Sequence, residues 1–150
     1  RCVILGLETE RGRVMVREIV HDPMFLLRKS EDATQADLQT AQDLLDTLRA
    51  NFDRCVGMAA NMIGVAKKII AVNDNGKYLV MFNPEIISKF GEFETEEGCL
   101  SLEGERKTVR YKTIKVKYFN ENFKQIKRSF SDFTAQIIQH EIDHCNGILI

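Results

Sequence analysis

The sequence predicts a single α+β domain, in which an early helix and a closing helix flank a run of antiparallel strands. Three observations support this fold class. The length of 150 residues fits one hydrophobic core. Apolar and charged residues make up 44% and 29% of the chain, as in ordinary globular proteins. The hydrophobic period changes from helical to alternating and back to helical, and no repeat, linker or low-complexity stretch marks a boundary between domains.

The start of the chain is predicted to lie outside this domain. Met15, followed by the sequence Val-Arg-Glu-Ile-Val, indicates a natural start, so we expect residues 1–14 to be an expression-derived or disordered segment. Residues 15–150 then form the single domain. The apolar stretch of residues 2–7 is too short for a secretory signal, and acidic residues follow it directly.

The clearest helix is predicted over residues 34–52. Its apolar residues recur at steps of three and four, which places them on one stripe of a helix. This stripe consists of Leu38, Ala41, Leu45, Leu48 and Phe52. Thr34 and Asp37 resemble a capping box at the helix start, with Asp in place of the usual Glu. The stripe carries no reactive side chain, and we interpret it as core.

Residues 53–66 lack a clear period but carry several small side chains. These are Gly57, Ala59, Ala60 and Gly64. Small residues let a backbone approach its neighbour closely, so we expect a close contact here.

The strands are predicted from alternation and from turn residues. Residues 69–73 and 78–83 form a hairpin around Asp74-Asn75-Gly76, and we expect Pro84 to end its second strand. Further along, apolar and charged residues alternate over residues 114–118, which predicts a strand, and a turn leads into another strand at residues 125–130.

The last helix is predicted to begin after Ser131 and to end near Cys145. Ser131 is a favourable N-cap residue, and Asn146-Gly147 is a typical stop signal.

Charge and hydropathy exclude several classes of function. The net charge of −1 argues against a wide basic face for nucleic acid, and the lysines between residues 112 and 127 alternate with apolar residues as on a solvated strand face. No run approaches the roughly 18 apolar residues of a membrane span. We therefore expect a cytoplasmic protein without direct nucleic-acid specificity, in which the four cysteines are free thiols.

The last helix contains the sequence His140-Glu141-Ile142-Asp143-His144, an H-E-x-x-H motif. Residues four apart share one helix face, so both imidazoles can bind one metal ion, while Glu141 can hold a metal-bound water as general acid and base. The alternative is a pair of histidines with ordinary surface partners. The helix is otherwise apolar, and burying unpaired imidazoles there would be costly without a metal.

Two histidines leave a catalytic metal site one protein ligand short. Cys99, in the short segment Glu97-Gly98-Cys99-Leu100-Ser101, is the leading candidate, and a thiolate there would leave a position open for water. Cys55 and Cys145 are weaker candidates. From the residues alone, a buried structural role for Cys99 stays open.

These two segments resemble the second and third motifs of the peptide deformylases, and Gly57-Met58-Ala59-Ala60 resembles part of the first motif. The resemblance covers roughly residues 15–150 and includes Arg106, Val109 and Arg110. The family often continues past the His pair with a helical tail, so we expect either a short variant or a sequence that stops before the natural end of the protein.

The resemblance implies antiparallel sheets around a central helix that carries the His pair. It implies a metallohydrolase that removes the formyl group from the initiator methionine of nascent polypeptides, with Cys99, His140 and His144 as ligands. Ferrous iron is the metal that it implies, with zinc or nickel also able to bind, and the substrates are formyl-methionyl nascent peptides at the ribosome. The backbone N–H of Leu100 is expected to stabilise the carbonyl oxygen of the substrate.

One departure from the family pattern affects the chemistry. Met62 stands where the family has a Gln that donates a hydrogen bond to the same oxygen, a loss that elsewhere costs about 10²–10³ in rate. Asn61 offers a carboxamide one residue away but faces oppositely on an extended segment. Glu103 also replaces a usual Pro. Gly57, Met62 and Ile142 are the residues expected to contact substrate, although ordinary core is the better interpretation of Ile142.

Three functions therefore remain under consideration. The first is a working but slow or specialised deformylase. The second is a catalytically impaired protein that binds metal or a formylated peptide. The third is a metallopeptidase that uses the same motif on another acyl group. Asp143 faces away from the metal in a helix and is expected to be a structural partner, with Arg106 as a candidate.

Overall fold

A computed structural model describes residues 5–9 and 12–149 of the chain. The helices are α1 (Pro23–Leu26), α2 (Leu38–Ala50) and α3 (Asp132–Cys145), with the short 3-10 turns η1 (Gln35–Asp37) and η2 (Ala60–Ile63). The strands are β1 (Leu5–Thr9), β2 (Gly12–Val16), β3 (Gly57–Ala59), β4 (Ile69–Asp74), β5 (Lys77–Cys99), β6 (Leu102–Phe119) and β7 (Gln125–Ser131). The α+β prediction is confirmed.

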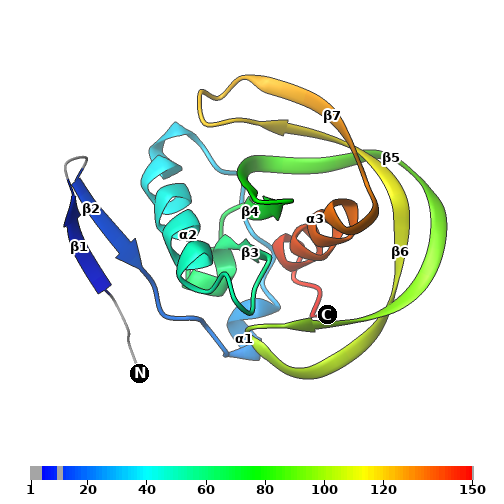
Figure 1. Ribbon diagram of the computed structural model, residues 1–150, viewed down its shortest axis with the longest axis horizontal. Helices are drawn as coiled ribbons and strands as arrows, with labels where there is room; N and C mark the ends of the chain where they lie inside the picture. Colours follow the sequence, from blue (N-terminus) through cyan, green and yellow to red (C-terminus); the bar gives the residue numbers. More distant parts are fainter. Residues whose placement is uncertain (1–4, 10–11, 150) are drawn as a thin grey trace.

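The main sheet has five antiparallel strands in the order β3-β4-β5-β6-β7. Figure 1 shows that the long strands β5 and β6 curve around α3, while α2 lies on the other side of β4. The sheet therefore holds α3 at the centre of the molecule, as the resemblance implied.

Alternation along β4 explains this layering, because successive side chains of a strand point to opposite faces. Ile69 and Ala71 pack into a core cluster with α2, whereas Ile70 and Val72 pack into a second cluster with α3. All four are fully buried. The sheet is thus apolar on both faces where the two helices cover it.

The positions of the predicted helices are confirmed closely. The predicted core stripe is wrong at its two ends, because Leu38 and Phe52 are exposed and Phe52 lies beyond the end of α2. Thr34 and Asp37 form the predicted capping box, although it caps the turn η1 that leads into α2. Helix α3 begins after Ser131 and ends at Cys145, as expected, but the Ser131 side chain makes no capping hydrogen bond. Gly147 follows with φ of +75°, and a Cβ there would clash with the carbonyl oxygen of Leu27.

The strands match their predicted positions at β4 and β7, but the prediction that Pro84 ends a strand is wrong. Strand β5 continues through Pro84 to Cys99. The pairing with β6 shifts register between Phe82 and Glu85, and Asn83 there has φ of +53°. Such a bulge leaves residues out of the ladder, so the missing N–H of proline costs no strand hydrogen bond.

The N-terminal residues form the two-stranded sheet of β1 and β2, which Figure 1 shows apart from the main sheet. The end of β2 and the residue after it are held by α2, because Met15 N–H donates to Asp46 and Arg17 N–H donates to Thr47. Of the predicted foreign segment 1–14, residues 1–4 and 10–11 lie outside the described residues, so the boundary at Met15 stays a prediction. Among the described residues no helix is long and apolar enough to cross a membrane.

Candidate active site

Helix α3 carries His140 and His144 on one face, as their spacing of four residues predicts. The two ring centroids are 4.8 Å apart, and the two Nε2 atoms are 3.2 Å apart. Both side chains are buried, and His144 is fully so. Burial lowers the pKa of His144 to about 3, with a further contribution from the neighbouring His140. His144 therefore stays neutral at physiological pH, the form in which imidazole binds a metal.

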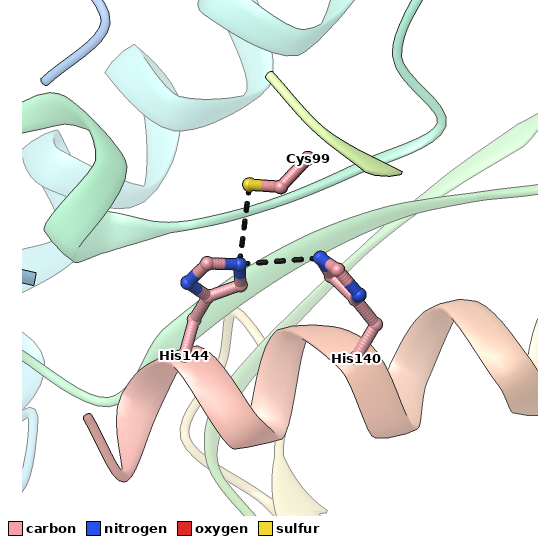
Figure 2. A group of neighbouring side chains, drawn as sticks. All are labelled: Cys99, His140 and His144. Carbon is pink, nitrogen blue, oxygen red and sulfur yellow. Dashed lines mark hydrogen bonds between the residues drawn. The ribbon is translucent and has the colours of Figure 1, made fainter. Parts of the chain in front are cut away.

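Cys99 approaches this pair from the end of β5, where a tight turn leads into β6. Its Sγ lies 3.2 Å from Nε2 of His144. Figure 2 shows the thiol and the two imidazoles pointing toward one another from the loop and from α3. The three potential ligand atoms all lie within 4.8 Å of one another. The structure therefore brings the three predicted ligands together.

The donor set fits a single divalent metal ion. Zinc binds imidazole nitrogen at about 2.0–2.1 Å and thiolate sulfur at about 2.3 Å, and its tetrahedral ligand atoms are then between about 3 and 4 Å apart. The distance from Cys99 Sγ to His144 Nε2 and the distance between the two Nε2 atoms, both 3.2 Å, fall within that range. With an ion bound in this arrangement, Cys99, His140 and His144 would supply three ligands, the number found in catalytic sites.

Glu97 holds His140 in the orientation that a ligand needs. His140 Nδ1 lies 2.8 Å from Glu97 Oε1, and because a carboxylate only accepts, Nδ1 donates and Nε2 is the nitrogen left to face a metal ion. Against the effect of burial, the hydrogen bonds to Cys99 and Glu97 raise the pKa of His140 to about 10, so a metal ion would have to displace the proton from Nε2. Arg110 and Gln136 donate to the same carboxylate. Burial acts to raise the pKa of Glu97, but the hydrogen bonds from His140, Arg110 and Gln136 outweigh it and bring the pKa to about 2. Glu97 is therefore ionised at neutral pH.

Arg110 extends this network to α3, where its Nη1 donates to Asp143 at 2.7 Å. Asp143 is thus a structural partner, as expected, but the suggested partner Arg106 is wrong: Arg106 donates to the carbonyl of Glu103. The positioning roles of Glu97, Arg110 and Gln136 were not predicted. One signal was available, because Gln136 precedes His140 by four residues and so shares its helix face.

Glu141 lies beside the candidate metal ligands and is almost fully buried. Its Oε1 atom has no hydrogen-bond partner among the described residues. Burial raises the pKa of Glu141 to about 7, although the nearby His140 acts in the opposite direction. A carboxyl group with a pKa near the working pH can both accept and return a proton, which suits general acid–base catalysis.

Gly57 makes the close backbone approach that its small size predicted. A Cβ at this position would lie 2.5 Å from Cγ2 of Ile137 and 3.0 Å from Oε2 of Glu141. No side chain therefore fits between β3 and α3 at this point. The glycine brings the backbone of an edge strand against the carboxylate.

A cavity of about 550 Å³ opens over these groups. The predicted site residues that line it are Gly57, Met62, Cys99, Leu100, His140 and Glu141. His144 lies beneath, fully buried. Ile142 is not among the lining residues, and it packs in the core cluster around α3 instead. The cavity thus gathers every predicted catalytic residue and leaves out one of the three residues expected to contact substrate.

Met62 and Asn61 occupy different surroundings. Met62 lines the cavity and is buried, and its Sδ accepts from Ala59 N–H at 3.5 Å. Asn61 instead donates from Nδ2 to the carbonyl of His144 at 2.8 Å and does not line the cavity. Its carboxamide is therefore already used to anchor the end of α3 and does not replace the missing Gln.

The other described cysteines are poor metal ligands. The Cys55 thiol donates to the carbonyl of Gly57 at 3.0 Å, and burial together with the nearby Glu141 raises its pKa to about 12. Burial likewise raises the pKa of Cys145 to about 12. Both thiols stay protonated, whereas a ligand must be a thiolate. As expected, Cys55, Cys99 and Cys145 are free of disulfides.

The model of the polypeptide deformylase family matches residues 16–150. The chain belongs to the peptide deformylase family. A relative from Clostridium beijerinckii named peptide deformylase is 54% identical over 136 residues, which cover 91% of this chain and all of that protein. A second, from Pseudothermotoga lettingae, is 41% identical over 90% of this chain and 81% of its own length.

Solved peptide deformylases share the fold. The crystal structure of the Legionella pneumophila enzyme has a TM-score of 0.81 at 36% identity and covers 89% of this chain and 83% of that one. An Acinetobacter baumannii peptide deformylase solved with bound Met-Ala-Ser also has a TM-score of 0.81, at 29% identity over 89% of this chain and 96% of that one. The deformylase is thus a hydrolase of a metal-dependent family that removes the formyl group from nascent peptides.

Proposed function

We propose that Cys99, His140 and His144 hold one divalent metal ion in this deformylase, and that Glu141 moves the proton during hydrolysis of the formamide bond. The observation that carries this proposal is the convergence of one sulfur and two imidazole nitrogens within 4.8 Å beside a buried carboxyl group. Sulfur and nitrogen ligands suit iron and zinc alike. We propose ferrous iron as the physiological ion, with zinc or nickel as substitutes.

A divalent ion at this site lowers the pKa of water to about 7 and polarises a carbonyl oxygen. Glu141 accepts the proton of the attacking water at a carboxylate oxygen, and it later returns that proton to the nitrogen of the departing amine. Glu97 keeps the His140 ring fixed throughout. The backbone N–H of Leu100, on the cavity wall, donates to the oxygen on which negative charge develops.

The proposed substrates are peptides that begin with formyl-methionine. The binding of Met-Ala-Ser to the Acinetobacter baumannii relative supports this, because that peptide corresponds to the product. Phe133 and Ile137 add apolar surface to the cavity, which suits a methionine side chain. We further propose that the deformylase meets these peptides at the ribosome, in the cytoplasm.

Metal content and formate release should rise and fall together. We expect anaerobically prepared protein to hold about one equivalent of metal and to release formate from formyl-Met-Ala-Ser. Cys99→Ala should lose most of both, because two imidazoles alone bind the ion weakly. Cys55→Ala removes a thiol from the same cavity and should keep the metal. Full metal binding and turnover by Cys99→Ala would contradict the assignment of this ligand.

Loss of the Glu97 carboxylate should weaken metal binding although Glu97 touches no ion. Replacement of such a supporting group typically costs about 10–100-fold in affinity, so we expect a loss of this size for Glu97→Gln, measured by competition with a coloured chelator. Glu94→Gln makes the same change at an exposed position of the same strand and serves as control. Equal affinities of the two variants would show that the His140 contact does not orient the ligand.

A further inference from the structure

The cavity has an exposed rim around its buried floor. The exposed residues that line this rim come from four segments of the chain: Arg54, Val56, Glu96, Gly98, Gly104 and Phe133. Two of them are charged and of opposite sign: Arg54 in the segment between α2 and β3, and Glu96 on β5. Neither forms an ion pair within the described part of the chain, so both charges are available to a peptide that leaves the cavity.

Arg54 is held in place by a neutral partner. Its Nε and Nη2 donate to Oδ1 of Asn51 at 3.2 and 3.0 Å, and Nδ2 of Asn51 donates to the carbonyl of Thr47 at 2.8 Å in the last turns of α2. The guanidinium is therefore tied to a helix end. Because the side-chain amide of Asn51 carries no net charge, the positive charge of Arg54 remains uncompensated. A side chain that is already oriented loses less conformational entropy when it binds a carboxylate.

The position of Arg54 in the chain limits how far from the reacting centre it lies. It precedes Gly57 by three residues, and three residues span at most about 11 Å. The backbone of Gly57 lies against Glu141, on the cavity floor. An extended peptide advances about 3.3 Å per residue, so the second and third residues of a substrate fall within the reach of the rim when its formyl group is at the floor.

We propose that Arg54 is a specificity-determining residue that favours an acidic side chain at the second or third residue of a formyl-methionyl peptide. Glu96, on another wall of the same rim, carries the opposite charge. It partly offsets the preference for an acidic side chain when Arg54 is present, and it favours a basic side chain when Arg54 is removed. This inference rests on the proposed function. Exposed ion pairs are weak, so the preference is about two- to fivefold in kcat/KM.

The test compares formyl-Met-Asp-Ser with formyl-Met-Lys-Ser, and formyl-Met-Ala-Asp with formyl-Met-Ala-Lys, all amidated at the C-terminus to remove the terminal charge. Formate release gives kcat/KM for each peptide, and the ratio of acidic to basic substrate is the readout. We expect a ratio above one in at least one pair, below one for Arg54→Gln because Glu96 remains, and lower still for Arg54→Glu. Added salt should bring the ratio toward one.

Arg28→Gln removes an arginine that does not line the cavity and serves as control for net charge. It should leave the ratio unchanged. Equal turnover of the acidic and basic peptides by the unaltered protein and by Arg54→Glu would overturn the inference while leaving the deformylase activity in place. Formate release from none of the peptides would instead overturn the proposed function.

Discussion

Glu141→Gln should leave the metal bound and lower formate release by about 10²–10⁴-fold, the usual contribution of a general acid–base group. The substitution keeps the shape of the side chain and removes its ability to accept a proton. Glu141 is the only carboxyl group among the described residues that combines near-complete burial, a place on the cavity wall and an unpartnered oxygen. Formate release and metal content should be measured on the same sample.

Asp132→Asn provides the matched control, because it makes the same change in charge at an exposed position of the same helix. Asp132 has φ of +57°, which asparagine also tolerates. The control should retain full activity. If Glu141→Gln kept more than about a tenth of the activity, the proton would have to be moved by another group.

Met62→Gln should raise the rate at least tenfold, and by as much as about 10²–10³-fold, the effect of one donor to a developing oxyanion. Met62 Sδ now accepts from Ala59 N–H at the cavity wall. The Oε1 atom of a glutamine can take over that acceptor role. Its Nε2 is then free to donate into the cavity, so the donor gains a fixed orientation. Kinetics with formyl-Met-Ala-Ser should show the increase in kcat.

Met62→Leu separates this effect from a change in packing. It removes the sulfur without adding a donor and should give no increase. A rate for Met62→Gln within twofold of the unaltered protein, with the metal still bound, would mean that the oxyanion is already fully stabilised by other groups such as Leu100 N–H.

Elements with a strong local pattern were predicted well, and those held by distant partners were not. The stripe in α2 and the alternation in β4 and β7 are visible in short windows of sequence. Residues 87–96 of β5 are mostly exposed and show little alternation, and Phe90 is 67% exposed. Pairing with β6 keeps this segment extended, and such pairing leaves no local signal.

The same distinction applies to the site. The spacing of His140, Glu141 and His144 follows from helix geometry, so it could be predicted without the fold. The contact between Glu97 and His140 depends on how β5 crosses α3, and spacing alone cannot reveal it. Arg106 and Arg110 lie on the same face of an alternating strand, so only the observed burial of Arg110 distinguishes the true partner of Asp143.

The charged network of Glu97, Arg110 and Asp143 has a consequence for engineering this protein. Removing water from paired charges costs roughly what their attraction returns, so such a network adds little net resistance to heat. Replacing such a network with well-packed aliphatic residues often increases the stability of the folded protein. If variants are selected for thermal stability alone, we therefore expect the residues of this network to be replaced first. The proposed metal affinity would then fall while the fold is retained.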